Sequence, residues 1–296
     1  MRNLKEAIII TNNSCNLKCI YCKVDELSRN TISKEHIKNL IDELSLRKIS
    51  FLHYIGGEPL LRKDIFEIMN YSKEKEIKNV LHSNGSSLKL FHKALPHIHT
   101  YHTCLNGNKK SHEITRGINT FDHVMNCIKL AKEQDVNVIV DMILTFETAT
   151  IENIDFVIEQ AIKNSFKINF QKVFAHNLVG VNANDIVTIQ ASNEKLFNLF
   201  TYIEKQYDKN IFHNSLDYIK THQEKNQIEV NECKNDIIVI NYSGNVSTCY
   251  GFMNNENNGL KIGWHTAINN ILQNNTGCTT CSYSNHAESN LKNNRN

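Results

Sequence analysis

The chain of 296 residues is long enough for one large α/β domain with a small appendage, or for two ordinary domains. Hydrophobic residues make up 41% and charged residues 22%, which excludes overall disorder and predicts a sizeable core. The net charge of +2, from 33 basic and 31 acidic residues, gives no electrostatic basis for nucleic acid or an anionic membrane as a partner. No apolar run approaches the roughly 18 residues of a membrane span, and the first run is too short for a signal peptide. We therefore expect a cytoplasmic protein, in which clustered cysteines indicate metal rather than disulfides.

Up to about residue 172, short apolar runs alternate with amphipathic stretches. Strands are expected at residues 6–11, 49–55, 79–83, 98–105, 136–144 and 167–171. Helices are expected over about 14 residues from Lys34, with Ser33 as N-cap, and at 64–75, 121–134 and 152–164, with a short one after the third strand. About six βα units in succession predict an α/β fold with a parallel sheet, as a partial (β/α)6 barrel. A doubly wound sheet fits nearly as well; in either fold the functional sites belong at the C-terminal ends of the strands.

The character of the chain changes after residue 175. Residues 191–232 read as a helical linker, and residues 233–284 read as a small α+β domain. Ser243-Gly244 signals a hairpin there, and a short helix is expected near 266–272. We therefore divide the chain into a core domain at 1–190, the linker, the small domain, and a polar tail at 285–296.

A first cysteine cluster, Cys15, Cys19 and Cys22, follows the first expected strand with C-x3-C-x2-C spacing. Three thiolates on one loop can converge on a metal centre and leave one position of a four-coordinate centre without a nearby protein ligand. A structural zinc site prefers four protein ligands, whereas an iron–sulfur cluster with one open iron suits three. A zinc site completed by a distant histidine is the alternative.

This motif, with Tyr21 before its last cysteine, resembles the radical S-adenosylmethionine (SAM) superfamily. The resemblance implies that Cys15, Cys19 and Cys22 ligate a [4Fe–4S] cluster whose open iron binds the amino and carboxylate groups of SAM. It also implies that an electron from the cluster cleaves the sulfonium, and that the 5′-deoxyadenosyl radical then abstracts a substrate hydrogen. The Tyr21 backbone is expected to face the adenine, and a flavodoxin or ferredoxin to act as reductant.

Further motifs follow in the order of that superfamily. Gly56-Gly57-Glu58-Pro59 resembles the GGEP motif, although a Gly-Gly pair alone can be a plain turn. Ser83-Asn84-Gly85 resembles a T-N-G element. The stretch from Cys104 to Gly117 resembles a pattern found in enzymes that modify peptides and proteins. By resemblance, the cofactor-binding residues are Tyr21, Gly57, Glu58, Ser83, Asn84, Cys104 and Arg116. The alternative for Arg116 is a surface salt bridge.

The sequence departs from the superfamily pattern at two positions. Cys104 replaces the usual serine, and Asn106 replaces the usual aspartate. Cys104 is open to three interpretations: a conservative replacement, a buried core thiol, or a hydrogen-atom donor of the kind that epimerases of the superfamily need. Cys127 lies in an amphipathic stretch and is expected in the core.

A second cluster, Cys233, Cys249, Cys278 and Cys281, can hold zinc or a [4Fe–4S] cluster. Its layout resembles the SPASM and twitch domains, and since no cysteine follows Cys281 it looks like the twitch form. That form implies one auxiliary cluster with four protein thiolates and an electron-transfer role. Tyr250 stands where sulfatase-maturing relatives place an acidic base. It is a candidate catalytic residue, and packing against the cluster is the alternative.

Three functions compete. The leading one is oxidation, cross-linking or epimerisation of a ribosomally synthesised peptide, based on the Cys104–Gly117 stretch and the auxiliary cluster. No N-terminal peptide-recognition extension is expected, because the first strand begins near residue 6. The second is a dehydrogenase or epimerase acting on an aminocyclitol or aminoglycoside, which predicts a closed polar pocket rather than an open channel. The third is a non-catalytic zinc scaffold.

Overall fold

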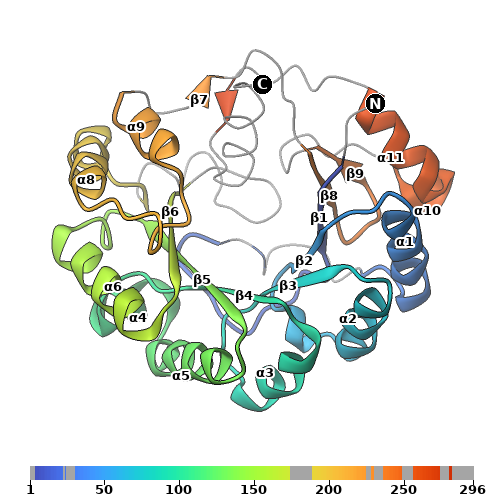
Figure 1. Cartoon of the computed structure of the whole chain (residues 1–296), viewed down its shortest axis with the longest axis horizontal. Coiled ribbons are helices and arrows are strands. Elements are labelled where there is room, and N and C mark those ends of the chain that lie inside the picture. Colours follow the sequence, from blue (N-terminus) through green and yellow to red (C-terminus); the bar gives the residue numbers. More distant parts are fainter. Residues whose placement is uncertain are drawn as a thin grey trace.

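The structure is a computed structural model. It describes residues 4–22, 24, 31–173, 189–224, 228–229, 236–248, 256–273 and 280–281. Six parallel βα units form a partial barrel, with the strands inside and the helices outside (Figure 1). Its strands are β1 (Glu6–Ile10), β2 (Phe51–Ile55), β3 (Lys78–His82), β4 (Thr100–Cys104), β5 (Asn137–Leu144) and β6 (Lys167–Lys172). Its helices are α1 (Lys34–Leu46), α2 (Ile65–Glu74), α3 (Leu88–Ala94), α4 (Lys109–Arg116), α5 (Thr120–Glu133) and α6 (Ile151–Asn164), with short 3-10 turns η2 (Pro59–Leu61) and η3 (Leu95–His97).

The predicted fold class is confirmed. All six strands pair in parallel in the order β6-β5-β4-β3-β2-β1, and their helices cover only the outer face. A doubly wound sheet, which needs helices on both faces, is excluded. The first helix shows how local sequence sets an element: Ser33 Oγ accepts from the His36 N–H at 3.3 Å, and the buried face of the helix carries Ile37 and Leu40.

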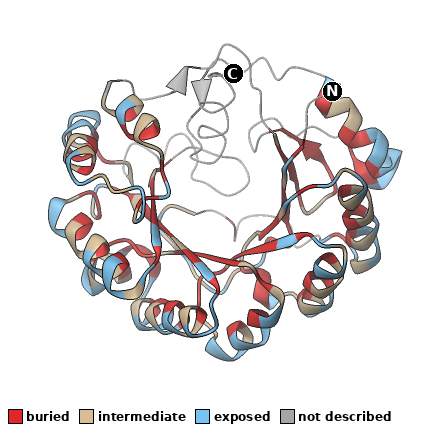
Figure 2. Cartoon of the chain, in the orientation of Figure 1, coloured by how far each residue is buried: buried red, intermediate tan, exposed pale blue. Residues whose placement is uncertain are grey.

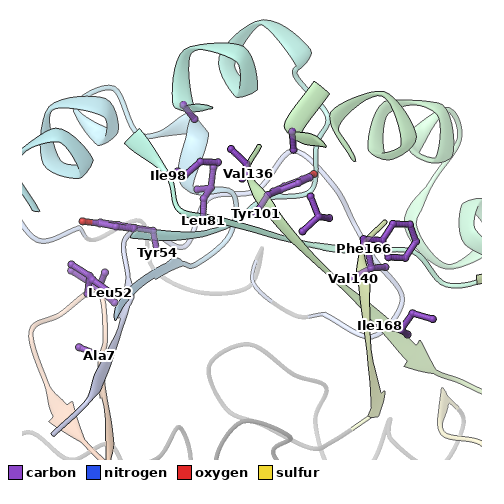
Figure 3. Packing of buried hydrophobic residues seen from close by; sticks show 14 of the residues in the cluster. Ala7, Leu52, Tyr54, Leu81, Ile98, Tyr101, Val136, Val140, Phe166 and Ile168 are labelled. Carbon is purple, nitrogen blue, oxygen red and sulfur yellow. The ribbon is translucent and has the colours of Figure 1, made fainter. Parts of the chain in front are cut away.

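The hydrophobic core lies between the sheet and the helices. Alternate strand side chains such as Leu52, Leu81 and Val140 point outward against the helices (Figure 3). Buried residues accordingly concentrate on the strands and on the helix faces turned toward them (Figure 2). Because alternate residues of a strand face opposite sides, the remaining strand residues line the barrel interior and are free to carry chemistry.

The C-terminal part extends the same sheet. It contains α8 (Asn193–Lys205), α9 (Leu216–Glu224), β7 (Ile228–Glu229), β8 (Ile237–Ile240), β9 (Val246–Ser247), α10 (Gly259–Ile262), α11 (Trp264–Gln273) and β10 (Thr280–Cys281). Strand β8 pairs in parallel with β1, and β9 returns antiparallel to β8 through the predicted hairpin, in which Gly244 has φ +84°. The described strands of residues 233–284 thus include an added edge of the barrel sheet, and the division at residue 233 stays a prediction. In the part of the chain that the structure covers, no helix has the length and apolar character needed to cross a membrane.

Candidate functional site

The three clustered cysteines lie on the loop that leaves the C-terminal end of β1. Cys15, Cys19 and Cys22 are half-buried free thiols. The Cys22 N–H donates to the Cys19 carbonyl at 3.0 Å, and the Ile20 N–H donates to the Thr115 carbonyl of α4 at 3.0 Å. The loop is therefore held both within itself and against the helix that follows β4.

The electrostatics of this loop fit a metal cofactor. Burial raises the pKa of Cys15, and it raises the pKa of Cys22 to about 11, with further contributions from the neighbouring thiols. Three adjacent thiolates are thus costly on their own. A coordinated metal removes that cost because its positive charge stabilises the deprotonated ligands.

The Gly56-Gly57 turn after β2 packs backbone to backbone against the cysteine loop. A Cβ on Gly57 would lie 2.1 Å from the Ser14 carbonyl oxygen, and one on Gly56, which has φ +144°, would lie 2.3 Å from the Asn12 carbonyl oxygen. The Gly57 N–H donates to the Asn12 carbonyl at 3.0 Å, and the Glu58 N–H donates to the Ser14 carbonyl at 2.8 Å. These positions require glycine because no side chain fits between the two backbones.

The Glu58 carboxylate joins the ends of β2 and β3. It accepts from Ser83 Oγ at 2.9 Å, from the Asn84 N–H at 2.8 Å and from the Leu60 N–H at 3.0 Å. Burial raises the pKa of Glu58, while these hydrogen bonds oppose the rise. Hydrogen-bond donors from the protein itself therefore occupy the Glu58 carboxylate, which positions the Gly56-Gly57 turn. Its contact with a cofactor stays a prediction.

Asn84 extends this connection to the cysteine loop. Its Nδ2 donates to Asn16 Oδ1 at 3.0 Å and lies 3.8 Å from Cys15 Sγ, while its Oδ1 accepts from the Ser86 N–H at 2.8 Å. The structure thus brings the element after β3 against the first predicted cluster ligand.

Arg116 is the buried cation of the site. It ends α4, it is 6% exposed, and its Nη1 donates to the Tyr21 hydroxyl at 2.8 Å. A surface salt bridge, the alternative expectation for Arg116, is therefore wrong. Its Nε is buried without a hydrogen-bond partner among the described residues. A buried guanidinium with a spare donor fits an anionic group such as a carboxylate.

Tyr21 and Cys104 lie beside this guanidinium. The Tyr21 side chain is engaged with the protein, and the predicted contact of its backbone with adenine stays a prediction. Cys104 ends β4 and is half-buried, so it is not a core thiol. Burial raises the pKa of Cys104 to about 12, against the attraction of Arg116. Cys127, by contrast, is fully buried among apolar side chains, as predicted.

Asn106 has a structural reason for replacing aspartate. Its Nδ2 donates to the Tyr21 hydroxyl and to Thr115 Oγ1, both at 3.0 Å, and its Oδ1 accepts from the Ile143 N–H at 3.0 Å. Of the two side chains, only the amide of asparagine can donate and accept at once, since the ionised carboxylate of aspartate only accepts. Asn106 therefore ties β4, β5, α4 and the cysteine loop together.

The predicted auxiliary-cluster site falls largely outside the described residues. Cys233, Cys249, Cys278 and Tyr250 lie outside them. Only the backbone of Cys281 is described, in β10, where it pairs with Ile228 of β7.

A polar row inside the barrel was missed by reasoning from the sequence. Glu6, His53, His82, His102 and Asp141 come from β1 to β5 in turn. Successive side chains lie 3.0, 3.1, 3.1 and 3.3 Å apart. The available signal was one histidine or acidic residue in each strand from β1 to β5, and reading it needs the register between strands.

Six parallel βα units with a three-thiol loop after the first strand define a barrel enzyme built around a metal cofactor. The family model described as the radical SAM superfamily matches residues 9–161, and the chain belongs to that superfamily. Its enzymes use a [4Fe–4S] cluster and SAM. The superfamily prediction is confirmed, while the twitch form and the auxiliary cluster stay predictions.

Curated relatives match only part of this chain. Fe-coproporphyrin III synthase of Methanosarcina barkeri is 29% identical over 146 residues, which are 45% of this chain and 36% of that protein. Mycofactocin maturase MftC of Mycolicibacterium smegmatis is 30% identical over 74 residues, 24% of this chain and 19% of that protein. The chain thus spans about a third or less of these relatives.

Solved structures share the fold over most of the chain. Streptococcus suis SuiB bound to the precursor peptide SuiA has a TM-score of 0.68 at 15% identity, covering 88% of this chain and 65% of that one. Native anSMEcpe with bound AdoMet has a TM-score of 0.60 at 19% identity, covering 83% and 74%. At these identities the likeness establishes the fold alone.

Proposed function

We propose that this radical SAM enzyme reductively cleaves SAM and abstracts a hydrogen atom from a ribosomally synthesised peptide, in an oxidation, a cross-link or an epimerisation. One observation carries the proposal. The stretch from Cys104 to Gly117, which resembles peptide- and protein-modifying enzymes, contributes Arg116 to the cysteine loop through Tyr21. The part of the sequence that indicates the substrate class is therefore built into the cofactor site.

Each residue of the site has a role in this proposal. The thiolates of Cys15, Cys19 and Cys22 hold the cluster, which when bound supplies the electron that cleaves SAM. Arg116 offers its unpartnered Nε to the SAM carboxylate. The Gly57 backbone and Asn84 hold the cysteine loop in place, so that the ligand thiols keep their positions.

The predicted C-terminal part adds further components. We propose that Cys233, Cys249, Cys278 and Cys281 hold an auxiliary [4Fe–4S] cluster that passes electrons, and that Tyr250 is a candidate acid or base beside it. A flavodoxin or ferredoxin supplies the electrons. We expect no nucleic-acid or membrane partner, and a cytoplasmic location, in keeping with the balanced charge.

Three of the similar proteins support a peptide substrate. SuiB was solved with the precursor peptide SuiA, anSMEcpe was solved with the peptide Cp18Cys, and MftC is a maturase. The second candidate, a dehydrogenase or epimerase of an aminocyclitol or aminoglycoside, is favoured by the polar row inside the barrel. Those side chains suit a ligand rich in hydroxyl and amine groups.

Anaerobic reconstitution followed by substrate screening tests both candidates. Two [4Fe–4S] clusters predict about eight iron atoms per chain, together with 5′-deoxyadenosine formed from SAM. Peptides encoded beside the gene and a panel of aminocyclitols are then compared for a mass change coupled to 5′-deoxyadenosine. A product from the peptide alone supports the first candidate, and a product from an aminocyclitol alone replaces it with the second.

A further inference from the structure

Three side chains with metal-binding atoms converge inside the barrel, outside the cysteine site. His82 of β3 and His102 of β4 are direct partners across the sheet, and Asp141 of β5 is the partner of Cys104. His102 Nδ1 lies 3.1 Å from His82 Nδ1 and 3.3 Å from Asp141 Oδ2. One ligand atom from each residue falls within 4.8 Å of the other two. Because β3, β4 and β5 are adjacent strands, a rigid sheet sets this arrangement (Figure 1).

The hydrogen-bond chain from Glu6 through a neutral His53 sets the tautomer of His82. His53 Nε2 lies 3.0 Å from Glu6 Oε2; in the neutral form of His53 this nitrogen donates its proton to the carboxylate, and His53 Nδ1 is left as an acceptor. His82 Nε2, 3.1 Å from His53 Nδ1, must then carry the proton of its ring. The Nδ1 of His82 consequently presents a lone pair toward His102 and Asp141, as a metal ligand does when its other ring nitrogen is hydrogen-bonded.

The two carboxylate oxygens of Asp141 also have different partners. Oδ1 accepts from Asn169 Nδ2 at 2.6 Å and from Gln171 Nε2 at 2.9 Å. Oδ2 is the oxygen turned toward His102. Amide donors thus orient the carboxylate, leaving Oδ2 directed at His102.

A neutral imidazole and an ionised carboxylate are the forms that coordinate a metal. The hydrogen bonds on the far side of each group therefore leave His82 Nδ1 and Asp141 Oδ2 on the side that faces His102.

We propose that His82, His102 and Asp141 bind a divalent transition-metal ion such as zinc. Ligand atoms about 2.1 Å from one metal ion stand about 3.0–3.4 Å apart at tetrahedral or octahedral angles, which is the separation of the closest pairs here. Two imidazoles and one carboxylate are a common ligand set for zinc and ferrous ions, and three protein ligands leave a coordination position open.

The location of the three ligands indicates what the open coordination position of the metal can bind. His102 precedes Cys104 by two residues on β4, a distance of about 7 Å along the strand. A cavity of about 810 Å³, lined in part by His53 and His102 and by Lys5 and Asn137 at the N-terminal ends of their strands, gives the ion a route in. The metal would then hold a carboxylate, amine or hydroxyl of a ligand that enters through this cavity. Metal binding itself does not rest on the proposed function.

Zinc binding to the reconstituted holoenzyme tests the proposal. The enzyme is treated with Zn²⁺, freed of excess metal, and examined by elemental analysis and zinc X-ray absorption. We expect about one zinc per chain with nitrogen and oxygen ligands at about 2.0–2.1 Å. The H82N/H102N variant should lose this zinc, with at least about a tenfold lower affinity. The matched control H92N/H123N removes two exposed histidines and should keep it.

Three results would overturn the proposal: no bound zinc, zinc with sulfur ligands at about 2.3 Å, or zinc unchanged in H82N/H102N. Thermal unfolding monitors folding, and D141N replaces the double variant if that variant fails to fold. Iron content and 5′-deoxyadenosine are measured in parallel. A failure of the radical SAM site is thereby distinguished from a failure of the zinc site.

Discussion

Replacing Gly57 by alanine places a methyl group where the structure has the backbone of the cysteine loop. The added Cβ would lie 2.1 Å from the Ser14 carbonyl oxygen and 2.9 Å from the Cys15 nitrogen. Restoring an ordinary contact requires a movement of about 1.3 Å. Metal ligands tolerate only about 0.2 Å, so Cys15 cannot keep its place in a cluster. The overpacking should also lower the free energy of unfolding by about 2 kcal/mol.

The assay is anaerobic reconstitution followed by iron counting, 5′-deoxyadenosine measurement and denaturant unfolding. We expect G57A to lose about four irons per chain and to form 5′-deoxyadenosine about 100-fold more slowly, while remaining folded. The control is G263A, because Gly263 has φ +81° and an added Cβ there would meet nothing within 4 Å. This control should lose about 1 kcal/mol of unfolding free energy through backbone strain and keep its iron.

Wild-type iron content and SAM cleavage in G57A would refute this reasoning. That result would mean that the contact between the glycine turn and the cysteine loop does not set the geometry of the cluster ligands.

Three further predictions concern single residues. E58A leaves three hydrogen-bond donors without their acceptor, so its free energy of unfolding, measured in denaturant, should fall by about 3 kcal/mol. A loss below about 1 kcal/mol would contradict the role of Glu58 in positioning the Gly56-Gly57 turn. R116K keeps the positive charge but loses the planar guanidinium, whose N–H groups can bind both oxygens of a carboxylate. The KM for SAM should therefore rise about tenfold at constant iron content. An unchanged KM would count against carboxylate binding by Arg116. Burial and Arg116 lower the pKa of His112 to about 3, so as pH falls below 6.5 the unfolded chain binds a proton that the folded chain does not. Wild-type unfolding free energy should therefore drop by about 2 kcal/mol more than that of H112Q between pH 7 and pH 5, and equal drops would show that His112 titrates normally.

The sequence predicted the elements whose signals are local. The Ser33 cap and the apolar face of α1, and the Ser243-Gly244 hairpin, depend on neighbours within a few residues, and both are confirmed. Helix α4 was not predicted because its sequence, KKSHEITR, is mostly polar and lacks an apolar stripe. The pairing of β8 with β1 was missed because the two strands lie more than 200 residues apart and nothing local specifies the partner of an edge strand.

The residues of the candidate site also differ in whether the local sequence reveals them. Cys15, Cys19 and Cys22 are recognisable because a short spacing brings them together on one loop. The row through His53, His82 and Asp141 is not recognisable, because it exists only once parallel strands are placed in register. Sequence reasoning could name Arg116 but not its burial against Tyr21, which depends on how α4 folds back over the loop.

Formation of 5′-deoxyadenosine by the C15A/C19A/C22A variant tests the central claim most directly. Its matched control is C127A, which removes a buried core thiol that is not one of the predicted cluster ligands. After reconstitution with iron, sulfide and a reductant, we expect C127A to cleave SAM and the triple variant to form no 5′-deoxyadenosine above the rate without enzyme. SAM cleavage by the triple variant at the wild-type rate would contradict the assignment of the reactive cluster to Cys15, Cys19 and Cys22.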